Sequence, residues 1–181
     1  MTWNSIHDAL RSQKSNLISI TIDGGDSTVL GNYREHEGIP SLRDFSALQT
    51  LELNDNAILG GWDREIDDYS MLLPPCLETL TISHASHNFF KVLEGILLKA
   101  PLTLPNWKLF TVGLLAEIVD APYDYSGPLF KKIEDLMTTA ESVGITWEWV
   151  DVVRRDDVAG PRYPNPDEMR LAMVSAWWED D

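Results

Sequence analysis

Three groups of side chains in this sequence are of types that could do chemistry. His84 and His87 lie three residues apart, a spacing at which two imidazoles on one helix face can bind a metal ion. A run of carboxylates could supply acid–base catalysis or calcium ligands; it consists of Asp63, Glu65, Asp67 and Asp68. Cys76 is the single cysteine, and its thiol could act as a nucleophile if a base activated it.

Each group also has a structural interpretation, which we favour. The two histidines follow a predicted strand and have no nearby Cys-x-x-Cys, so we expect turn and helix-capping residues. The acidic run lacks the ordered spacing of a calcium loop, which indicates a solvated face. No base can be named for the thiol. The segment "DGGDS", residues 23–27, is not followed by Gly-Lys-Ser/Thr, so it is interpreted as a turn rather than a phosphate site.

Composition limits the class of protein. The chain has 181 residues, which suits one domain with a sizeable core, and its 44% apolar content excludes a disordered chain despite a net charge of −15. A protein that grips nucleic acid replaces counterions with Lys and Arg, and only 14 such residues are present, so we expect no nucleic-acid and no membrane partner. Neither a signal peptide nor a membrane-spanning run is recognisable, and one cysteine cannot form an internal disulfide. We therefore predict a soluble cytoplasmic protein without cofactors.

A strand-like phrase recurs along the chain. In "LQTLELNDN", Leu51 and Leu53 point to one side of a strand and Thr50 and Glu52 to the other. Further copies are "LISITIDGG", "LETLTISHA", "WKLFTVGLL" and, in degraded form, "SVGITWEWV". The copies start at residues 17, 48, 77, 107 and 142, with separations of 31, 29, 30 and 35 residues. Such spacing predicts a strand and a helical return in each unit, stacked as a solenoid.

Helical periodicity occupies the longer connections. "NFFKVLEGILLKA" places its apolar residues on one side of a helix that we expect to end at Pro101. A second helix is predicted from Pro128 to a point near Gly144. The connections "SLRDFSA" and "REIDDYSMLLPP" are shorter and are expected to hold a turn or two of helix.

These units resemble the leucine-rich-repeat family. The pattern L-x-x-L-x-L-x-x-N is met in full by Leu48, Leu51, Leu53 and Asn56, and the wording around it is similar to fungal leucine-rich-repeat proteins, some of which carry an F-box. The resemblance covers most of residues 17–150. It implies an α/β fold, a short irregular solenoid of about five strand–helix units with a parallel sheet on its concave face. No F-box fits before Leu17, so the substrate-adaptor role of F-box relatives would transfer only if that module was lost or lies in another chain.

Helical caps are expected at both ends, because a stack exposes its terminal apolar faces. At the front, Trp3, Ile6 and Leu10 share one helical face, so the cap is placed at residues 1–15 of a repeat region covering 1–150. Residues 151–181 are predicted to form a polar linker followed by a capping helix that starts at Asn165.

The concave face is the predicted binding surface. Side chains that flank the apolar strand positions should lie in three rows: Ser19, Thr50, Thr79 and Leu109; Thr21, Glu52, Thr81, Thr111 and Thr146; and Asp23, Asn54, Ser83, Gly113 and Glu148. No member is basic. Two insertions, "STVLGNYREHEGIPS" and "GLLAEIVDAPYDYSG", would form a rim, the second with Tyr123 and Tyr125.

Two functions remain open at this point. The first is a non-enzymatic module that binds a protein or peptide on the concave sheet face and the rim loops, and the acidic face favours a basic partner. The second is an enzyme that uses carboxylates in the insertions, among them Asp63, Asp67 and Asp124, on an inert scaffold. The strand face can also be hydroxyl-rich simply because threonine favours strands.

Overall fold

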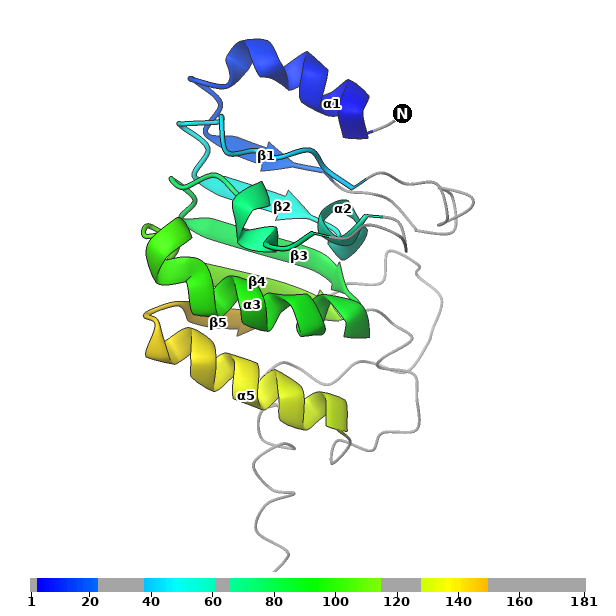
Figure 1. Ribbon diagram of the computed structural model, residues 1–181, viewed down its shortest axis with the longest axis vertical. Coiled ribbons are helices and arrows are strands. Elements are labelled where there is room, and N and C mark those ends of the chain that lie inside the picture. The colour runs from blue at the N-terminus through cyan, green and yellow to red at the C-terminus, as the bar shows by residue number, and fades with distance from the viewer. Residues whose placement is uncertain (1–2, 23–37, 61–65, 115–127, 150–181) are drawn as a thin grey trace, which may run out of the picture.

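A five-stranded parallel sheet organises the chain. The computed structural model describes residues 3–22, 38–60, 66–114 and 128–149. The strands follow one another across the sheet in sequence order, so that β1 and β5 are its edges (Figure 1). They are β1 (Ser19–Thr21), β2 (Thr50–Leu53), β3 (Thr79–Ala85), β4 (Leu109–Leu114) and β5 (Thr146–Trp149). The α/β class and the five-stranded parallel sheet are therefore confirmed.

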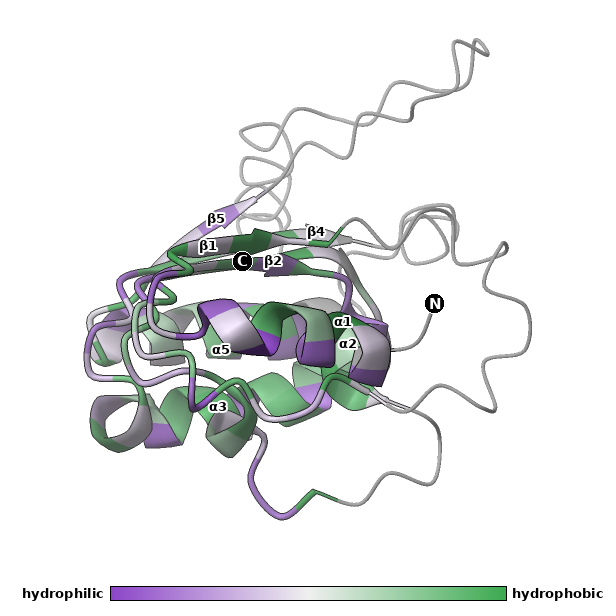
Figure 2. Cartoon of the chain, turned by 90° about the horizontal axis from the view of Figure 1, so that it is seen from above, coloured by the Kyte–Doolittle hydropathy of each residue, from purple (hydrophilic) through white to green (hydrophobic). Residues whose placement is uncertain are grey.

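Helices account for most of the remaining described residues. The α-helices are α1 (Trp3–Leu10), α2 (Asp55–Leu59), α3 (His87–Thr103) and α5 (Pro128–Ser142). Two short 3₁₀ helices are η1 (Arg11–Gln13) and η2 (Tyr69–Leu72). The long helices α3 and α5 lie side by side on one face of the sheet (Figures 1 and 2). The connection "SLRDFSA" contains turns but no helix, contrary to expectation, whereas "REIDDYSMLLPP" holds η2.

One buried residue from each strand forms the centre of the core. The parallel register aligns Ile20 with Leu51, Leu51 with Leu80, Leu80 with Phe110, and Phe110 with Trp147. Leu51, Leu80 and Phe110 are fully buried. The row beside it contains Leu53, Ile82 and Val112, which are also fully buried. The alternation in the repeated phrase thus directs its apolar side chains toward the helices, as the sequence predicts.

The fifth copy of the phrase is displaced by two residues from its predicted place. Thr146 pairs with Leu109, so the position equivalent to Leu48 or Leu77 is Gly144 and not Ser142. The cause is the end of α5. Gly144 has φ = 81°, its N–H donates to the Glu141 carbonyl, and the N–H of Ile145 donates to the Ala140 carbonyl. This is a Schellman motif, in which Ile145 is buried as part of the helix end rather than as a strand residue of the repeat.

The helices mostly follow their predicted faces. In α3 the expected residues are buried, namely Phe89, Phe90, Leu93, Ile96, Leu97 and Ala100. The predicted end at Pro101 is wrong, since the helix continues to Thr103 and the N–H of Leu104 closes the last turn on the Ala100 carbonyl at 2.8 Å. The bounds predicted for α5 are confirmed, and its Ile133, Leu136 and Ala140 are buried.

Aromatic rings fill the space between the last strands and α3. Phe110 contacts three rings, with centroid distances of 6.3 Å to Phe89, 5.9 Å to Trp107 and 4.7 Å to Trp147. Trp147 in turn lies 5.8 Å from Trp149 on the edge strand. The indole N–H of Trp147 is buried and has no hydrogen-bond partner among the described residues. Within the described part of the chain, the rings of Phe110 and Trp149 are the aromatic contacts that position this side chain.

At the other end of the sheet, α1 lies beside β1 (Figure 1). Leu10 packs against the core, and the ring of His7 meets Phe45 edge-on at 5.7 Å. The predicted front helix is thus present. The segment predicted as the rear cap, residues 165–181, lies outside the described residues, as does the linker before it. Among the helices of the described part, none is long and apolar enough to cross a membrane.

The central row of the core generates the first testable prediction. Replacing either Leu51 or Leu80 by alanine should lower the free energy of unfolding by about 2 to 5 kcal/mol, because each leaves a cavity between sheet and helices. Urea denaturation of each variant measures the loss. Losses below about 1 kcal/mol at both positions would contradict the described core.

Candidate protein-binding surface

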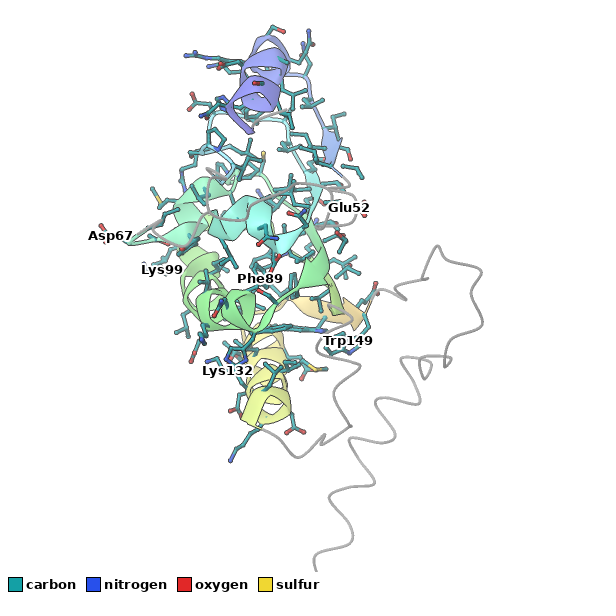
Figure 3. All side chains as sticks on the ribbon, turned by 90° about the vertical axis from the view of Figure 1, so that its right-hand side faces the viewer. Glu52, Asp67, Phe89, Lys99, Lys132 and Trp149 are labelled. Atoms are coloured by element: carbon teal, nitrogen blue, oxygen red, sulfur yellow. The ribbon has the colours of Figure 1, made fainter. Side chains whose placement is uncertain are left out.

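The face of the sheet that points away from α3 and α5 carries seven of the predicted site residues, namely Thr50, Glu52, Thr79, Thr81, Thr111, Thr146 and Glu148. We call it the open sheet face, and define it by Ser19, Thr21, Thr50, Glu52, Thr79, Thr81, Leu109, Thr111, Thr146 and Glu148. Figure 2 shows the described helices on the opposite side of the sheet. In Figure 3, Glu52 points outward from the sheet, whereas Phe89 lies between α3 and the strands. The open sheet face is thus uncovered by any described helix.

Burial along the strands agrees with this placement. In β2, Thr50 and Glu52 are half-buried while Leu51 and Leu53 are fully buried. Residues of the face on the two edge strands, such as Thr21 and Glu148, are exposed, and those on the inner strands, such as Thr81 and Thr111, are half-buried. Neighbouring side chains on a sheet shield one another in this way even when nothing lies above them.

The strand register sorts the face into two rows. The upper row consists of Thr21, Glu52, Thr81, Thr111 and Glu148, and the lower row of Ser19, Thr50, Thr79, Leu109 and Thr146. The predicted rows are correct for β1 to β4 in these two sets. The predicted rows of Thr146 and Glu148 are wrong by one place, because of the shift at the end of α5. As a result Glu52 and Glu148 occupy the same row.

The upper row is acidic and rich in hydroxyl groups. The hydroxyl of Thr21 donates to Glu52 Oε2 at 3.3 Å, which ties the carboxylate to the adjacent strand. Thr81 and Thr111 lie between the two carboxylates. No residue of the open sheet face is basic. The surface thus offers carboxylate acceptors together with hydroxyl groups that can donate and accept hydrogen bonds.

Asn54 does not belong to this surface, which corrects the predicted site. It is only 7% exposed, and its Oδ1 accepts the N–H of Ala57 at 3.0 Å. The side chain therefore caps α2, a helix that the repeat pattern did not predict. The strand alternation ends at Leu53 because the chain turns into this helix. Asn54 followed by an acidic residue in the first turn is a helix-start signal that was available in the sequence.

Two further members of the predicted third row, Ser83 and Gly113, do not extend the open sheet face either. Gly113 is buried, and the hydroxyl of Ser83 donates to the Leu53 carbonyl at 3.4 Å. The pairing of β3 with β4 is irregular between Ile82 and Ala85, so the row loses its regular spacing there. Asp23, together with the predicted rim residues Tyr123 and Tyr125, lies outside the described residues.

A buried acid, Asp55, was missed by sequence reasoning. Asp55 is 1% exposed, and its Oδ2 accepts the N–H of Ser86 at 2.8 Å. Ser86 is the N-cap residue of α3 and makes no capping bond with its own side chain. The Asp55 carboxylate thus accepts a backbone N–H at the start of α3, from a residue 31 positions further along the chain.

The capping role of Asn54 can be tested by substitution. Asn54→Ala should lower the free energy of unfolding by about 0.5 to 2 kcal/mol, because the first turn of α2 loses a buried acceptor. Asn54→Ser keeps a capping oxygen and should lose less. Chemical denaturation compares the two variants with the parent, and equal losses for alanine and serine would argue against the cap.

The cysteine, histidines and acidic residues that could do chemistry form no reactive group among the described residues. Cys76 donates its thiol to the carbonyls of Phe45 and Leu48, at 3.3 and 3.2 Å. His87 is exposed at the start of α3, and the side chain of His84 is not described. Within the described ranges, no three His, Cys, Asp or Glu side chains gather in a way that could hold a metal ion. Asp63, Glu65 and Asp124 lie outside those ranges, and so do residues 23–27.

Asp68 holds η2 against α3. Its Oδ1 accepts from the N–H and the hydroxyl of Ser70, at 3.0 and 2.6 Å, and its Oδ2 lies 2.9 Å from Nζ of Lys99. Partial burial raises the pKa of this carboxyl, but the hydrogen bonds from Ser70 and Lys99 outweigh that effect and lower the pKa below its ordinary value of 3.8. Its neighbour Asp67 is exposed and lies at the outer side of this connection (Figure 3).

The lowered pKa of Asp68 predicts a pH dependence. The ionised carboxylate stabilises the folded state above the ordinary value of 3.8, and this contribution disappears as pH falls from 3.8 through the lower folded-state value. Asp68→Asn should therefore cost about 0.5 to 1 kcal/mol at neutral pH, since solvent screens the ion pair, and progressively less below 3.8. Urea titrations across this range test it; a pH-independent difference would contradict the assignment.

Comparison of the chain with protein-family models, curated proteins and solved structures found no match.

Proposed function

We propose that this protein is a non-enzymatic interaction module that binds a protein or peptide on its open sheet face. The observation that carries the proposal is the row Thr21, Glu52, Thr81, Thr111 and Glu148, which is uncovered by the described helices and contains no basic side chain. Hydroxyl groups and carboxylates are suited to hydrogen bonds with a polypeptide, and the acidic residues favour a basic one.

We also propose that the five strands belong to a short solenoid of the leucine-rich-repeat type. In support, each strand pairs with the next in sequence, and the equivalent residues Ser19, Thr50, Thr79 and Leu109 are separated by 31, 29 and 30 residues. In such a stack α1 covers the β1 end and residues 165–181 supply a helix at the β5 end. An adaptor role is consistent with this architecture, because a stack presents a broad surface and needs no catalytic group.

Charge reversal on the open sheet face tests the proposed function. A benzophenone side chain at Thr81 would first cross-link and identify the bound polypeptide. Glu52→Lys combined with Glu148→Lys should then weaken the affinity for that partner about tenfold or more, because two attractive pairs become repulsive. Biolayer interferometry measures the affinity, and the association rate for the parent should also fall as salt rises.

A matched control lies on the helical side of the molecule. Asp135 and Glu141 are exposed on α5, so reversing both to lysine makes the same change in net charge away from the open sheet face. This variant should bind the partner like the parent. Equal loss in both variants would show that net charge, and not the open sheet face, governs binding; no loss in either would reject the face as the binding surface.

A further inference from the structure

The sheet determines the backbone separation of the two acidic residues in the upper row. Glu52 lies on β2 and Glu148 on β5, and the register places Thr81 and Thr111 between them on β3 and β4. Neighbouring strands lie about 4.8 Å apart, so three steps across the sheet amount to about 14 Å. A partner that meets both carboxylates must therefore carry two cationic groups at about this separation.

The positions between the carboxylates suit a polypeptide backbone. Thr81 and Thr111 continue the upper row, and Thr50 and Thr79 lie beside them in the lower row. Their side chains are half-buried, short and without charge. A threonine hydroxyl can both donate and accept a hydrogen bond, so this strip can bind the N–H and C=O groups of a chain that crosses the strands.

An extended chain matches both the distance and the strip. Residues in an extended segment advance about 3.3 Å each and alternate in direction, so side chains at i and i+4 lie on one side about 13 Å apart. Side chains at i and i+3 point to opposite sides. A helix advances only about 1.5 Å per residue and covers 14 Å after about nine residues, by which point the side chain has rotated to its far side.

We propose that the partner segment of this surface is an extended basic peptide that lies across β2 to β5, with Lys or Arg at positions i and i+4. One cationic side chain contacts Glu52, which the Thr21 hydroxyl orients, and the other contacts Glu148. The residues between them face the threonine strip. This inference rests on the proposed function and specifies the chemical class and conformation of the partner.

The test uses synthetic peptides of one composition. Each contains Ser and Thr with two arginines, placed at i and i+4 or, in the comparison peptides, at i and i+3 or i and i+2. Fluorescence anisotropy measures their binding to the full chain at low ionic strength. The i, i+4 peptide should bind about three- to tenfold more tightly, because only it engages both carboxylates at once. The variant carrying Glu52→Gln and Glu148→Gln should lose this preference.

Asp135→Asn with Glu141→Gln, again on α5, is the charge-matched control and should retain the preference. The inference is overturned if the three peptides bind equally, if the preference survives in the Glu52 and Glu148 variant, or if none binds at about 1 mM. The proposed function is judged separately by the cross-link at Thr81 and the charge reversals. If the charge reversals abolish partner binding but the three peptides bind equally, the proposed function stands and only the i, i+4 spacing is rejected.

Discussion

The rest of the structure depends on the parallel register of the five strands. Because Ile20, Leu51, Leu80, Phe110 and Trp147 are partners across successive ladders, one apolar residue from each strand reaches the same level of the core. A slip of one residue would exchange the two faces, placing leucines in solvent and threonines against α3 and α5. The register that packs the core therefore also determines which residues lie on the open sheet face. A change in register would alter both faces together.

Much of this arrangement can be predicted from local patterns. The alternation of apolar and polar residues is strong in "LISITI", "LQTLEL" and "LETLTI", and it correctly predicts which side chains are buried in β1 to β3. The faces of α3 and α5 follow from helical periodicity in the same way. Each of these predictions depends on residues close together in sequence, where the burial of one face dominates the energetics.

The sequence predictions fail where a turn or a helix cap uses residues that the repeat pattern assigns to a strand. Ile145 looks like a strand residue, but the positive φ of Gly144 makes it part of the end of α5, which displaces β5 by two residues and changes the rows of Thr146 and Glu148. Asn54 fits the alternation of β2, yet its side chain is used to cap α2. The contact between Asp55 and Ser86 joins residues 31 apart, and no local pattern indicates it. Turn and capping chemistry decides all three cases.

The order of the strands has a consequence for how such a surface can change over time. Every strand pairs with the next strand along the chain. Each strand therefore contributes one residue to each row of the open sheet face. Gain or loss of a whole unit between β2 and β5 would change the interval from Glu52 to Glu148 by one strand spacing, about 4.8 Å, and would leave each carboxylate in its own local setting. The distance between the two acidic residues would therefore change in discrete steps, and duplication of an internal unit would alter it without any point mutation at either residue.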